Sequence, residues 1–388
     1  MLTMAFWGSL ALVVYVYIGY PVLIALWSRV RPAPGRATQS NAATLPFVTV
    51  IIPAHNEERW IRRKIENTLQ LDYARGRLEV IVASDASTDS TVEQARQFED
   101  RGVRIVVFPT RRGKQEMLNR LVPLALGEII LCTDANALLE PQAVRRLVRH
   151  FASPRVGGVT GRRTCVQQAQ SAPSLGEGLY WRYESWIKES ESRVHSCLGA
   201  HGQIYAVRKK VFPRVEKVGE DFYIPMKVIA ATGLRVLYEP QAVAVIPAAA
   251  NLAGEFERKT RAHVSFLLTL PMLRELLLPW RSPVWWQYVS HHVLRMLVPP
   301  AMVLLLLSSA LLATAGTVYR TAAVVQPVFY GLAGIGFLLA RKGRQPKTFY
   351  IPFYFVFAHA ALGLAWLRWP LHKFEYAWER TERLTDAS

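Results

Sequence analysis

The sequence is poor in cysteine and in acidic residues. Its 388 residues include three cysteines, Cys132, Cys165 and Cys197, which are far apart and form no CxxC pair. This pattern argues against a disulfide framework and against a zinc site, and it is typical of a reducing compartment. Aspartate and glutamate number 29 against 47 lysines and arginines, so the formal net charge is +18. No basic stripe with interleaved aromatic residues accompanies this charge, and we therefore expect no nucleic-acid partner.

Charge of either sign is missing from four long segments. Residues 1–28, 296–319, 321–340 and 348–367 contain no Asp, Glu, Lys or Arg. Each segment is long enough to cross a hydrocarbon layer of about 30 Å as a helix. A purely soluble globular protein is therefore excluded. The first segment has neither the positive start nor the A-x-A site of a cleaved signal peptide, so it is interpreted as a retained helix.

The excess positive charge gathers beside the apolar segments. Arg29, Arg31 and Arg36 follow the first segment, and a second basic group separates the last two: Arg341, Lys342, Arg344 and Lys347. Such residues remain on the cytoplasmic side and attract anionic lipid headgroups. We therefore expect a multi-pass protein of a bacterial-type inner (plasma) membrane, with its N-terminus outside. The balanced charge of the tail leaves its side open: four full crossings place it outside, and a re-entrant segment would return it to the cytosol.

These features divide the sequence into six parts. Residues 264–280 are apolar but interrupted by Arg274 and Glu275, which favours a helix in the membrane interface over a spanning one. The expected parts are an N-terminal transmembrane helix (1–28), a basic linker (29–46), a cytosolic domain (47–262), an interfacial amphipathic segment (263–284), about three C-terminal transmembrane helices (285–370) and a tail (371–388). His291 and His292 have no acidic or cysteine partner at metal-ligating spacing, so both are interpreted as membrane-interface residues.

Between the apolar ends, short β-branched runs alternate with helical stretches. The expected strands are residues 47–52, 78–83, 103–108 and 128–133, and the expected helices lie near 58–70, 89–100, 114–126 and 141–151. This alternation predicts an α/β domain with a parallel sheet, helices on both faces and right-handed crossovers. Ligands of such sheets bind beyond the carboxyl ends of the strands.

Polar side chains follow these strand ends. Asp85 follows the second expected strand, and Asp134 follows the fourth, with Asn136 two residues later on the same side of an extended segment. One carboxylate and one amide oxygen form a sparse site of the kind that Mg²⁺ or Mn²⁺ accepts when substrate phosphates supply further ligands. Lys114, behind Gly113 at a helix start, could neutralise a diphosphate there. Taken singly, each strand-end Asp could instead cap a helix.

Four motifs in this region together resemble those of the family 2 glycosyltransferases. They are residues 50–57 (VIIPAHNE), 84–91 (SDASTDST), 112–119 (RGKQEMLN) and 133–136 (TDAN). The resemblance covers residues 47–262 and is strongest to membrane-embedded inverting enzymes of the cellulose-synthase, hyaluronan-synthase and chitooligosaccharide-synthase type. It implies a GT-A-type, Rossmann-like nucleotide-sugar-binding domain inserted between transmembrane helices.

The resemblance implies roles on the donor side of such a domain. The residues that would bind the nucleotide and diphosphate of a UDP-sugar are Ala54, Glu57, Asp85 and Lys114. Asp134 would coordinate Mg²⁺ or Mn²⁺ as the first member of the family's Asp-x-Asp motif, whose last position is Asn136 here. The Gln-x-x-Arg-Trp motif of processive members is absent. In its place, Arg258 and Arg261 lie three residues apart, so they could share a helix face and reach the diphosphate.

The resemblance also implies roles on the acceptor side. In residues 219–222 (GEDF), Asp221 would be the general base, and Glu220 stays the alternative because sequence does not separate adjacent acids. Residues 199–208 resemble the segment that lines the acceptor channel, and its candidate contacts are His201, Gly202 and Gln203. These roles fit the chemistry, since inverting transfer needs a base for the acceptor hydroxyl and positive charge on the departing diphosphate.

Three functions follow from these patterns. The leading hypothesis is transfer of a sugar from a nucleotide-sugar donor to a growing cell-surface or extracellular polysaccharide. The alternative is a polyprenyl-phosphate or other lipid-linked acceptor, which the apolar segment 264–280 motivates. A third is a membrane-anchored scaffold or nucleotide sensor without turnover, motivated by Asn136 and the missing Gln-x-x-Arg-Trp. No serine or cysteine nucleophile with a base partner is recognisable, so acyl transfer is not expected. The sugar, the linkage and any export or synthase partner subunits are left open.

Overall fold

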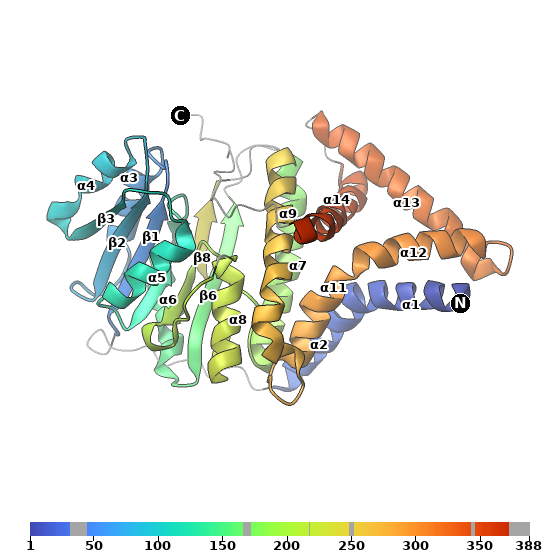
Figure 1. Cartoon of the computed structure of the whole chain (residues 1–388), viewed down its shortest axis with the longest axis horizontal. Helices are drawn as coiled ribbons and strands as arrows, with labels where there is room; N and C mark the ends of the chain where they lie inside the picture. Colours follow the sequence, from blue (N-terminus) through green and yellow to red (C-terminus); the bar gives the residue numbers. More distant parts are fainter. Residues whose placement is uncertain (32–44, 166–171, 217, 248–251, 343–345, 372–388) are drawn as a thin grey trace.

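The computed structural model describes residues 1–31, 45–165, 172–216, 218–247, 252–342 and 346–371. They form an α/β domain from which an arm of apolar helices projects (Figure 1). Most of the predicted linker 29–46 and of the predicted tail 371–388 lies outside the described residues, as do Arg36 and Arg344.

One mixed sheet organises the domain. Its strands are β1 (Val48–Ala54), β2 (Leu78–Asp85), β3 (Val103–Phe108), β4 (Ile129–Cys132), β5 (Leu138–Leu139), β6 (Val156–Cys165), β7 (Tyr205–Arg208) and β8 (Arg235–Ile246). Among the described residues, the eight strands lie in the order β3-β2-β1-β4-β7-β6-β8-β5. β1, β2, β3 and β4 are parallel to one another, and Ile51 lies beside both Ile81 and Cys132. The four predicted strands and their parallel pairing are confirmed.

Helices cover both faces of the parallel strands, as the alternation predicts. They are α3 (Ile61–Leu69), α4 (Thr91–Arg96), α5 (Lys114–Leu124) and α6 (Ala143–Val148). Ile52 of β1 belongs to the core cluster that contains Ile61 of α3, whereas its neighbour Ile51 belongs to the cluster that contains Met117 of α5. Successive side chains of the buried strand therefore enter opposite layers.

The second half of the sheet corrects the expectation of a purely parallel sheet. β7 runs antiparallel to both β4 and β6, and β6 and β8 are parallel to each other. β6 contains glycines at contacts that exclude a side chain: a Cβ on Gly161 would lie 2.4 Å from the carbonyl oxygen of Ala242. Glycine has a low strand propensity, so this half of the sheet gives a weak signal in the sequence.

Three long helices lie between the sheet and the arm (Figure 1): α7 (Ala172–Val194), α8 (Glu220–Thr232) and α9 (Leu252–Thr269). The predicted interfacial segment 263–284 contains the end of α9 and a 3₁₀ helix, Pro271–Leu277. Leu273 and Leu276 are fully buried in the same core cluster as Ile51. This segment is therefore part of the domain core, and its contact with a membrane stays a prediction.

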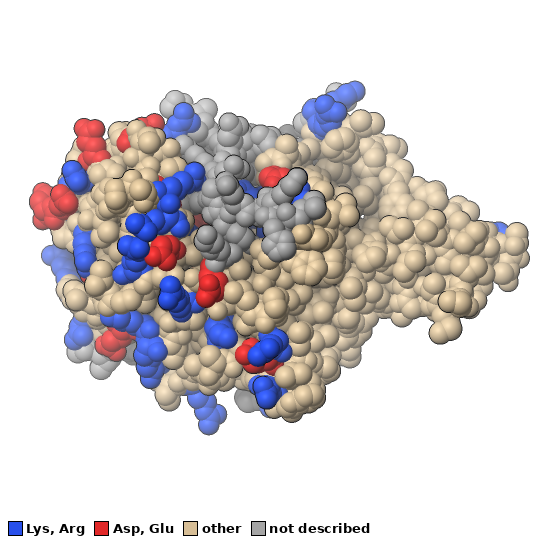
Figure 2. All heavy atoms as spheres, in the orientation of Figure 1, with Lys and Arg blue, Asp and Glu red and all other residues tan. Residues whose placement is uncertain are grey.

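The arm consists of apolar helices from both ends of the chain. α1 (Leu2–Val14), a π-helical turn (Tyr15–Gly19) and α2 (Tyr20–Val30) run continuously, and the later helices are α10 (Trp285–Tyr288), α11 (Leu294–Met296), α12 (Val298–Leu311), α13 (Thr317–Arg341) and α14 (Lys347–Arg368). Charged side chains gather on the α/β domain, whereas the arm shows an almost uncharged surface (Figure 2). This surface suits contact with lipid.

Three described helices are long and apolar enough to cross a membrane: Leu2–Val30, Thr317–Arg341 and Thr348–Arg368. A fourth crossing would need the pair Trp285–Met296 and Val298–Leu311, whose axes are bent by 56°. The uncharged segment 296–319 is not one continuous helix, because α12 ends at Leu311 and a turn separates it from α13. Pro299 and Pro300 lack a backbone N–H and follow the bend directly, so they interrupt the helical hydrogen bonds there.

Candidate active site

The donor-side candidates lie at the carboxyl ends of β1 and β2. Asp85 is fully buried, and its two carboxylate oxygens accept hydrogen bonds from the backbone N–H groups of Arg112 (2.7 Å) and Gly113 (2.9 Å). Gly113 has a φ of 83°, a conformation that favours glycine, and α5 begins immediately after it. Asp85 therefore fixes the loop that presents Lys114. Its contact with a nucleotide stays a prediction.

Hydrogen bonds also join the loops after β1 and β2. Ala54 ends β1 and pairs in register with Ser84. Thr88 donates its backbone N–H to Asn56 Oδ1 at 2.8 Å, and buried Glu57 donates its backbone N–H to Thr91 Oγ1 at 2.8 Å. Ala54 and Glu57 thus lie at the carboxyl edge of the sheet, in loops that hydrogen bonds connect. The sequence predicts that the nucleotide binds at this edge.

Lys114 lies between two carboxylates. Its Nζ is 2.8 Å from Asp134 Oδ1 and 2.5 Å from Glu220 Oε1, and all three side chains are largely buried. Burial alone would lower the pKa of Lys114, but the carboxylates of Asp134 and Glu220 hold it well above its ordinary value. The lysine is therefore a permanent cation at the carboxyl edge of the sheet.

Asp134 and Asn136 are the candidate ligands of a cation, and their role as such stays a prediction. Asp134 Oδ2 accepts a hydrogen bond from Gln203 Nε2 at 2.9 Å, and the Oδ1 of Asn136 is buried with no hydrogen-bond partner. An orphaned amide oxygen beside a carboxylate suits a divalent cation whose other ligands come from a substrate. Within the described ranges, no group of three or more His, Cys, Asp or Glu side chains could hold a metal ion by itself.

The two adjacent acids at the start of α8 have different environments. Glu220 forms an ion pair with Lys114, whereas the carboxylate of Asp221 lies beside Gly202: a Cβ on Gly202 would be 3.3 Å from Asp221 Oδ2. Desolvation and the charge of Glu220 raise the pKa of Asp221 to about 6, while Lys114 opposes the rise. A carboxyl group titrating near 6 is matched to general-base chemistry near neutral pH. The geometry thus gives the two acids different surroundings, and the assignment of the base stays a prediction.

The three acceptor-side candidates, His201, Gly202 and Gln203, have different neighbours. Gly202 lies against Asp221, and Gln203 contacts Asp134. His201 is buried, and its ring packs edge-on against the rings of Trp181 and Tyr238, with centroids 5.3 Å and 6.3 Å away. Burial and the charges of nearby cations keep the pKa of His201 well below its ordinary value, so the ring is neutral. Gly202 and Gln203 therefore contact the candidate acids, whereas the ring of His201 packs against Trp181 and Tyr238.

The two arginines predicted to reach the diphosphate lie on α9. Arg258 forms a bidentate ion pair with Glu255 on the same helix, with N–O distances of 2.9 Å and 2.7 Å. Burial opposes ionisation of Glu255, but Arg258 and Lys259 lower its pKa to about 2. Arg261 follows three residues later on this helix. The contact of either arginine with a diphosphate stays a prediction.

Lys64 is a site residue that the sequence analysis missed. It is fully buried on α3, and its Nζ donates to Thr133 Oγ1 at 2.8 Å and to the carbonyl oxygen of Ala137. These contacts hold both ends of the turn that carries Asp134 and Asn136. Burial lowers the pKa of Lys64 to about 7, while Asp134 opposes this shift. The sequence did contain one indication of this: Lys64 lies on the same face of α3 as the buried Ile61, where a lysine is unusual.

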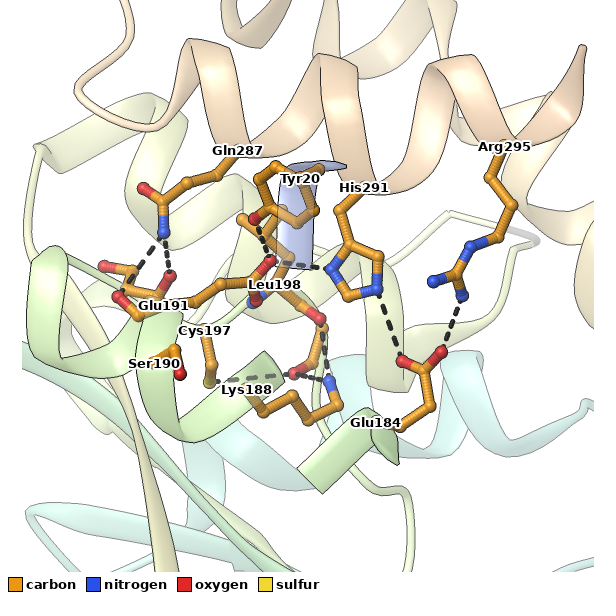
Figure 3. Close-up of polar contacts among 12 residues, drawn as sticks. Tyr20, Glu184, Lys188, Ser190, Glu191, Cys197, Leu198, Gln287, His291 and Arg295 are labelled. Carbon is orange, nitrogen blue, oxygen red and sulfur yellow. Dashed lines mark hydrogen bonds and ion pairs between the residues drawn. The ribbon is translucent and has the colours of Figure 1, made fainter. Parts of the chain in front are cut away.

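His291 has acidic partners that the sequence did not reveal. It is buried between two glutamates of α7 (Figure 3), and its position at a membrane interface stays a prediction. Its Nδ1 is 2.6 Å from Glu191 Oε1, and its Nε2 is 3.3 Å from Glu184 Oε2. His292 packs against the ring of Phe222 with a centroid distance of 4.9 Å. The acidic partners of His291 come from about a hundred residues away, so spacing along the sequence did not reveal them.

Comparisons with known proteins agree with this fold. Residues 49–215 match the model of glycosyl transferase family 2. The beta-monoglucosyldiacylglycerol synthase of Nostoc sp. (strain PCC 7120) is 27% identical over 203 residues, which are 51% of this chain and 42% of that protein. The poly-beta-1,6-N-acetyl-D-glucosamine synthase of Staphylococcus aureus (strain COL) is 22% identical over 260 residues, or 62% of each chain. The chain thus spans 42% and 62% of the length of these two relatives.

A solved structure matches nearly the whole chain. The mannosyltransferase PcManGT from Pyrobaculum calidifontis, in complex with GDP-Man and Mn²⁺, superposes with a TM-score of 0.70 at 24% identity. The match covers 96% of this chain and 100% of the other, so it includes the helical arm as well as the α/β domain. The fold is the GT-A type with a mixed sheet, flanked by apolar helices, and the chain contains a domain of glycosyl transferase family 2.

Proposed function

We propose that this chain is a membrane-embedded inverting glycosyltransferase that transfers a sugar from a UDP-sugar or related nucleotide-sugar donor to a growing polysaccharide. One observation carries the proposal. Lys114 is fixed as a cation between Asp134 and Glu220, and Asp221 lies next to this group against the Gly202 loop. A cation for a diphosphate and a base for an acceptor hydroxyl thus meet at one edge of the sheet.

The donor would bind on the side of Asp85 and Lys114. Lys114 would contact the diphosphate, and Asp134 with Asn136 would hold Mg²⁺ or Mn²⁺, which supplies further positive charge to the diphosphate when bound. The presence of GDP-Man and Mn²⁺ in the PcManGT structure supports this class of donor and of metal. Ala54, Glu57, Arg258 and Arg261 complete the proposed donor contacts.

The transfer itself would be a single displacement at the anomeric carbon. Asp221 accepts the proton of the acceptor hydroxyl, the acceptor oxygen forms the new glycosidic bond, and the bond to the diphosphate breaks. The released diphosphate keeps the bonding electrons, and the charge of Lys114 stabilises it. Inversion follows because one displacement occurs and no covalent enzyme intermediate forms.

The acceptor separates the leading function from its alternative. The relatives divide on this point, since one is named as a synthase of a glucosyl lipid and the other as a synthase of a poly-N-acetylglucosamine. The alternative, a lipid-linked acceptor, is supported by the direct packing of the domain against apolar helices, through contacts such as Tyr20 with Glu191. After delipidation, a polysaccharide product partitions into water, whereas a glycolipid stays in organic solvent.

The direct test is nucleotide release by the full chain in detergent. UDP-, GDP- and TDP-sugars would be supplied with Mg²⁺, Mn²⁺ or EDTA, and the parent compared with Asp221→Asn and Asp134→Ala. Asp100→Asn is the matched control because that carboxylate is exposed after α4. We expect metal-dependent release from one donor, lost in both site variants and kept in the control. Nucleotide binding without any release would favour the scaffold or sensor instead, and no binding would remove the proposal.

The membrane arrangement is proposed on the same basis. The domain would face the cytoplasm of a bacterial-type inner membrane, since Arg29 and Arg31 lie at the domain end of α2. Labelling of single cysteines placed at Arg101 and at Gly316 by a membrane-impermeant reagent in intact cells tests this. Only the position in the turn before α13 should react from outside.

A further inference from the structure

The segment between α7 and the acceptor-side candidates is held by side chains from distant elements. Residues 196–199 follow α7 and lead directly to Gly202 and Gln203. Figure 3 shows this segment surrounded by α7, by the N-terminal helix that carries Tyr20, and by the helices around His291. Its Cys197 and Leu198 are buried, so protein groups rather than solvent satisfy their backbone groups: Cys197 donates its N–H to the carbonyl oxygen of Val236 at 2.9 Å, and side chains hold Leu198.

Two charged residues of α7, Lys188 and Glu191, hydrogen-bond to the backbone of Leu198, and we call these bonds the grip on Leu198. Lys188 Nζ donates to the carbonyl oxygens of Leu198 (2.8 Å) and Gly199 (3.0 Å). Glu191, one turn later, accepts the backbone N–H of Leu198 on its Oε2 at 3.2 Å. Both side chains are buried, with 7% and 0% of their surface exposed. Charged groups at this depth are tolerated where hydrogen bonds satisfy them, and here these bonds fix one residue from both sides.

The second carboxylate oxygen of Glu191 reaches the apolar helices. Glu191 Oε1 accepts the hydroxyl of Tyr20 at 2.5 Å and lies 2.6 Å from His291 Nδ1. Gln287 donates to the carbonyl oxygen of Ser196 at 3.1 Å. Tyr20 belongs to the apolar helix Leu2–Val30, so a candidate membrane helix is linked to Leu198 through a single carboxylate.

On its other side the segment contacts the candidate catalytic groups. Ala200 donates its backbone N–H to the carbonyl oxygen of Asp221 at 2.7 Å, and Gly202 packs against the Asp221 carboxylate. Gln203 donates to Asp134 at 2.9 Å. Gly199 has a φ of 77°, and a Cβ there would lie 2.9 Å from the ring of Phe222, so the loop has little room to shift. A displacement of Leu198 would therefore move Gly202 and Gln203 relative to both acids.

We propose that Lys188 and Glu191 are positioning residues for glycosyl transfer, and that Tyr20 makes the N-terminal apolar helix part of their support. They fix Leu198 and thereby hold Gly202 against Asp221 and Gln203 against Asp134. The inference deepens the proposed function and rests on it. It predicts that damage to the grip reduces the rate of transfer and leaves donor binding intact, because Asp85 and Lys114 are held by other contacts.

The test compares Lys188→Met with Lys209→Met in the full chain in detergent. Lys209 is a matched control, since its Nζ also holds two backbone carbonyl oxygens, those of Pro123 (3.1 Å) and Ala125 (2.6 Å), away from this loop. We expect Lys188→Met to lower kcat by about 10- to 100-fold, as a small misplacement of reacting groups does. The Kd of the nucleotide donor should change less than about threefold. The control should leave both values as in the parent.

A milder pair of variants covers the case in which Lys188→Met does not fold. Tyr20→Phe removes only the hydroxyl bonded to Glu191, and Tyr73→Phe is its control because the Tyr73 hydroxyl donates to the carbonyl oxygen of Pro46 at 2.6 Å. We expect Tyr20→Phe to lower kcat about three- to tenfold with unchanged donor Kd, the effect of one lost hydrogen bond. Unchanged kcat in the folded Lys188 and Tyr20 variants, or a parallel loss of donor binding, would overturn the inference. An inactive parent would instead remove the proposed function.

Discussion

The donor-side and acceptor-side loops of the candidate site are held in different ways. On the donor side, Asp85 binds the backbone of Arg112, 27 residues away, and Asn56 binds that of Thr88, 32 residues away. On the acceptor side, Leu198 is held through Glu191, whose partners Tyr20 and His291 lie 171 and 100 residues away from it. The donor half is built from neighbouring βα units, whereas the acceptor half depends on helices from both ends of the chain.

This difference has a consequence for how the site responds to change. Contacts between adjacent loops of one sheet form whenever the sheet forms, so the proposed donor contacts of Glu57, Asp85 and Lys114 should tolerate damage to the apolar arm. Contacts through Tyr20 and His291 exist only when the arm packs on α7. Membrane helices would thus support the acceptor side of the reaction in particular, and variants of the two sides should separate binding from transfer.

The largest expected effect is at the point where the two halves meet. Asp221→Asn removes the proposed base but keeps the shape of the side chain next to Gly202. Loss of a general base lowers the rate by about 10²- to 10⁴-fold. Single-turnover transfer and equilibrium binding of the donor nucleotide would be measured together. Binding should stay near the parent value, and a variant with full transfer activity would show that Asp221 is not the base.

The next largest effect is expected from a substitution that disturbs only the donor-side loops. Asp85→Asn leaves one of the two N–H groups of Arg112 and Gly113 facing an amide NH₂ in a fully buried position. An unsatisfied buried N–H group costs about 1–3 kcal/mol, so we expect a lower melting temperature. The loop that presents Lys114 is disturbed by the same change, so the Kd of the nucleotide donor should weaken by at most about five- to 150-fold, the range that this free energy corresponds to.

The control for this variant is Asp72→Asn, an exposed carboxylate paired with Arg145 at 3.1 Å on the surface. It should leave the melting temperature and the donor Kd unchanged within about 0.5 kcal/mol. Equal effects of the two substitutions would mean that the Asp85 contacts do not organise the donor loop.

The sequence predicted the donor half well and the acceptor half poorly, for physical reasons. β1, β2 and β4 are largely buried runs rich in β-branched residues, and acids lie at or directly after the ends of β2 and β4, so periodicity located both the strands and Asp85 and Asp134. β6 carries glycine where Ala242 approaches, which hides its strand signal. The different surroundings of Glu220 and Asp221 could not be predicted without the position of Lys114, which pairs with Glu220. The burial of His291 could not be predicted without its glutamate partners on α7. Each of these depends on long-range packing that no local pattern encodes.

The pH dependence of kcat/KM tests the role of Asp221, which lies between the donor-side and acceptor-side loops. A base works only when it has lost its proton, so with the pKa of Asp221 at about 6 the value of kcat/KM should fall about tenfold per pH unit below 6 and level off above it. Desolvation and the charges of Glu220 and Asp134 raise this pKa, and Lys114 lowers it. Glu220→Gln removes one raising charge, and we expect the acid limb to move to lower pH. An unmoved or raised midpoint would mean that Asp221 is not the titrating base.

The smallest effect is expected on the exposed side of α7. It tests whether the position of Leu198 depends on the buried contacts of Lys188 and Glu191 or on the stability of the whole helix. Arg193 lies on the same helix as Lys188 and Glu191 and forms a 2.7 Å ion pair with Glu189, but both side chains are more than 40% exposed. Exposed pairs four residues apart contribute about 0.3–0.5 kcal/mol, so Arg193→Ala should change the free energy of unfolding by no more than that and leave kcat as in the parent. A loss of kcat comparable to that of Lys188→Met would show that the stability of α7, rather than its contacts with Leu198, controls the loop.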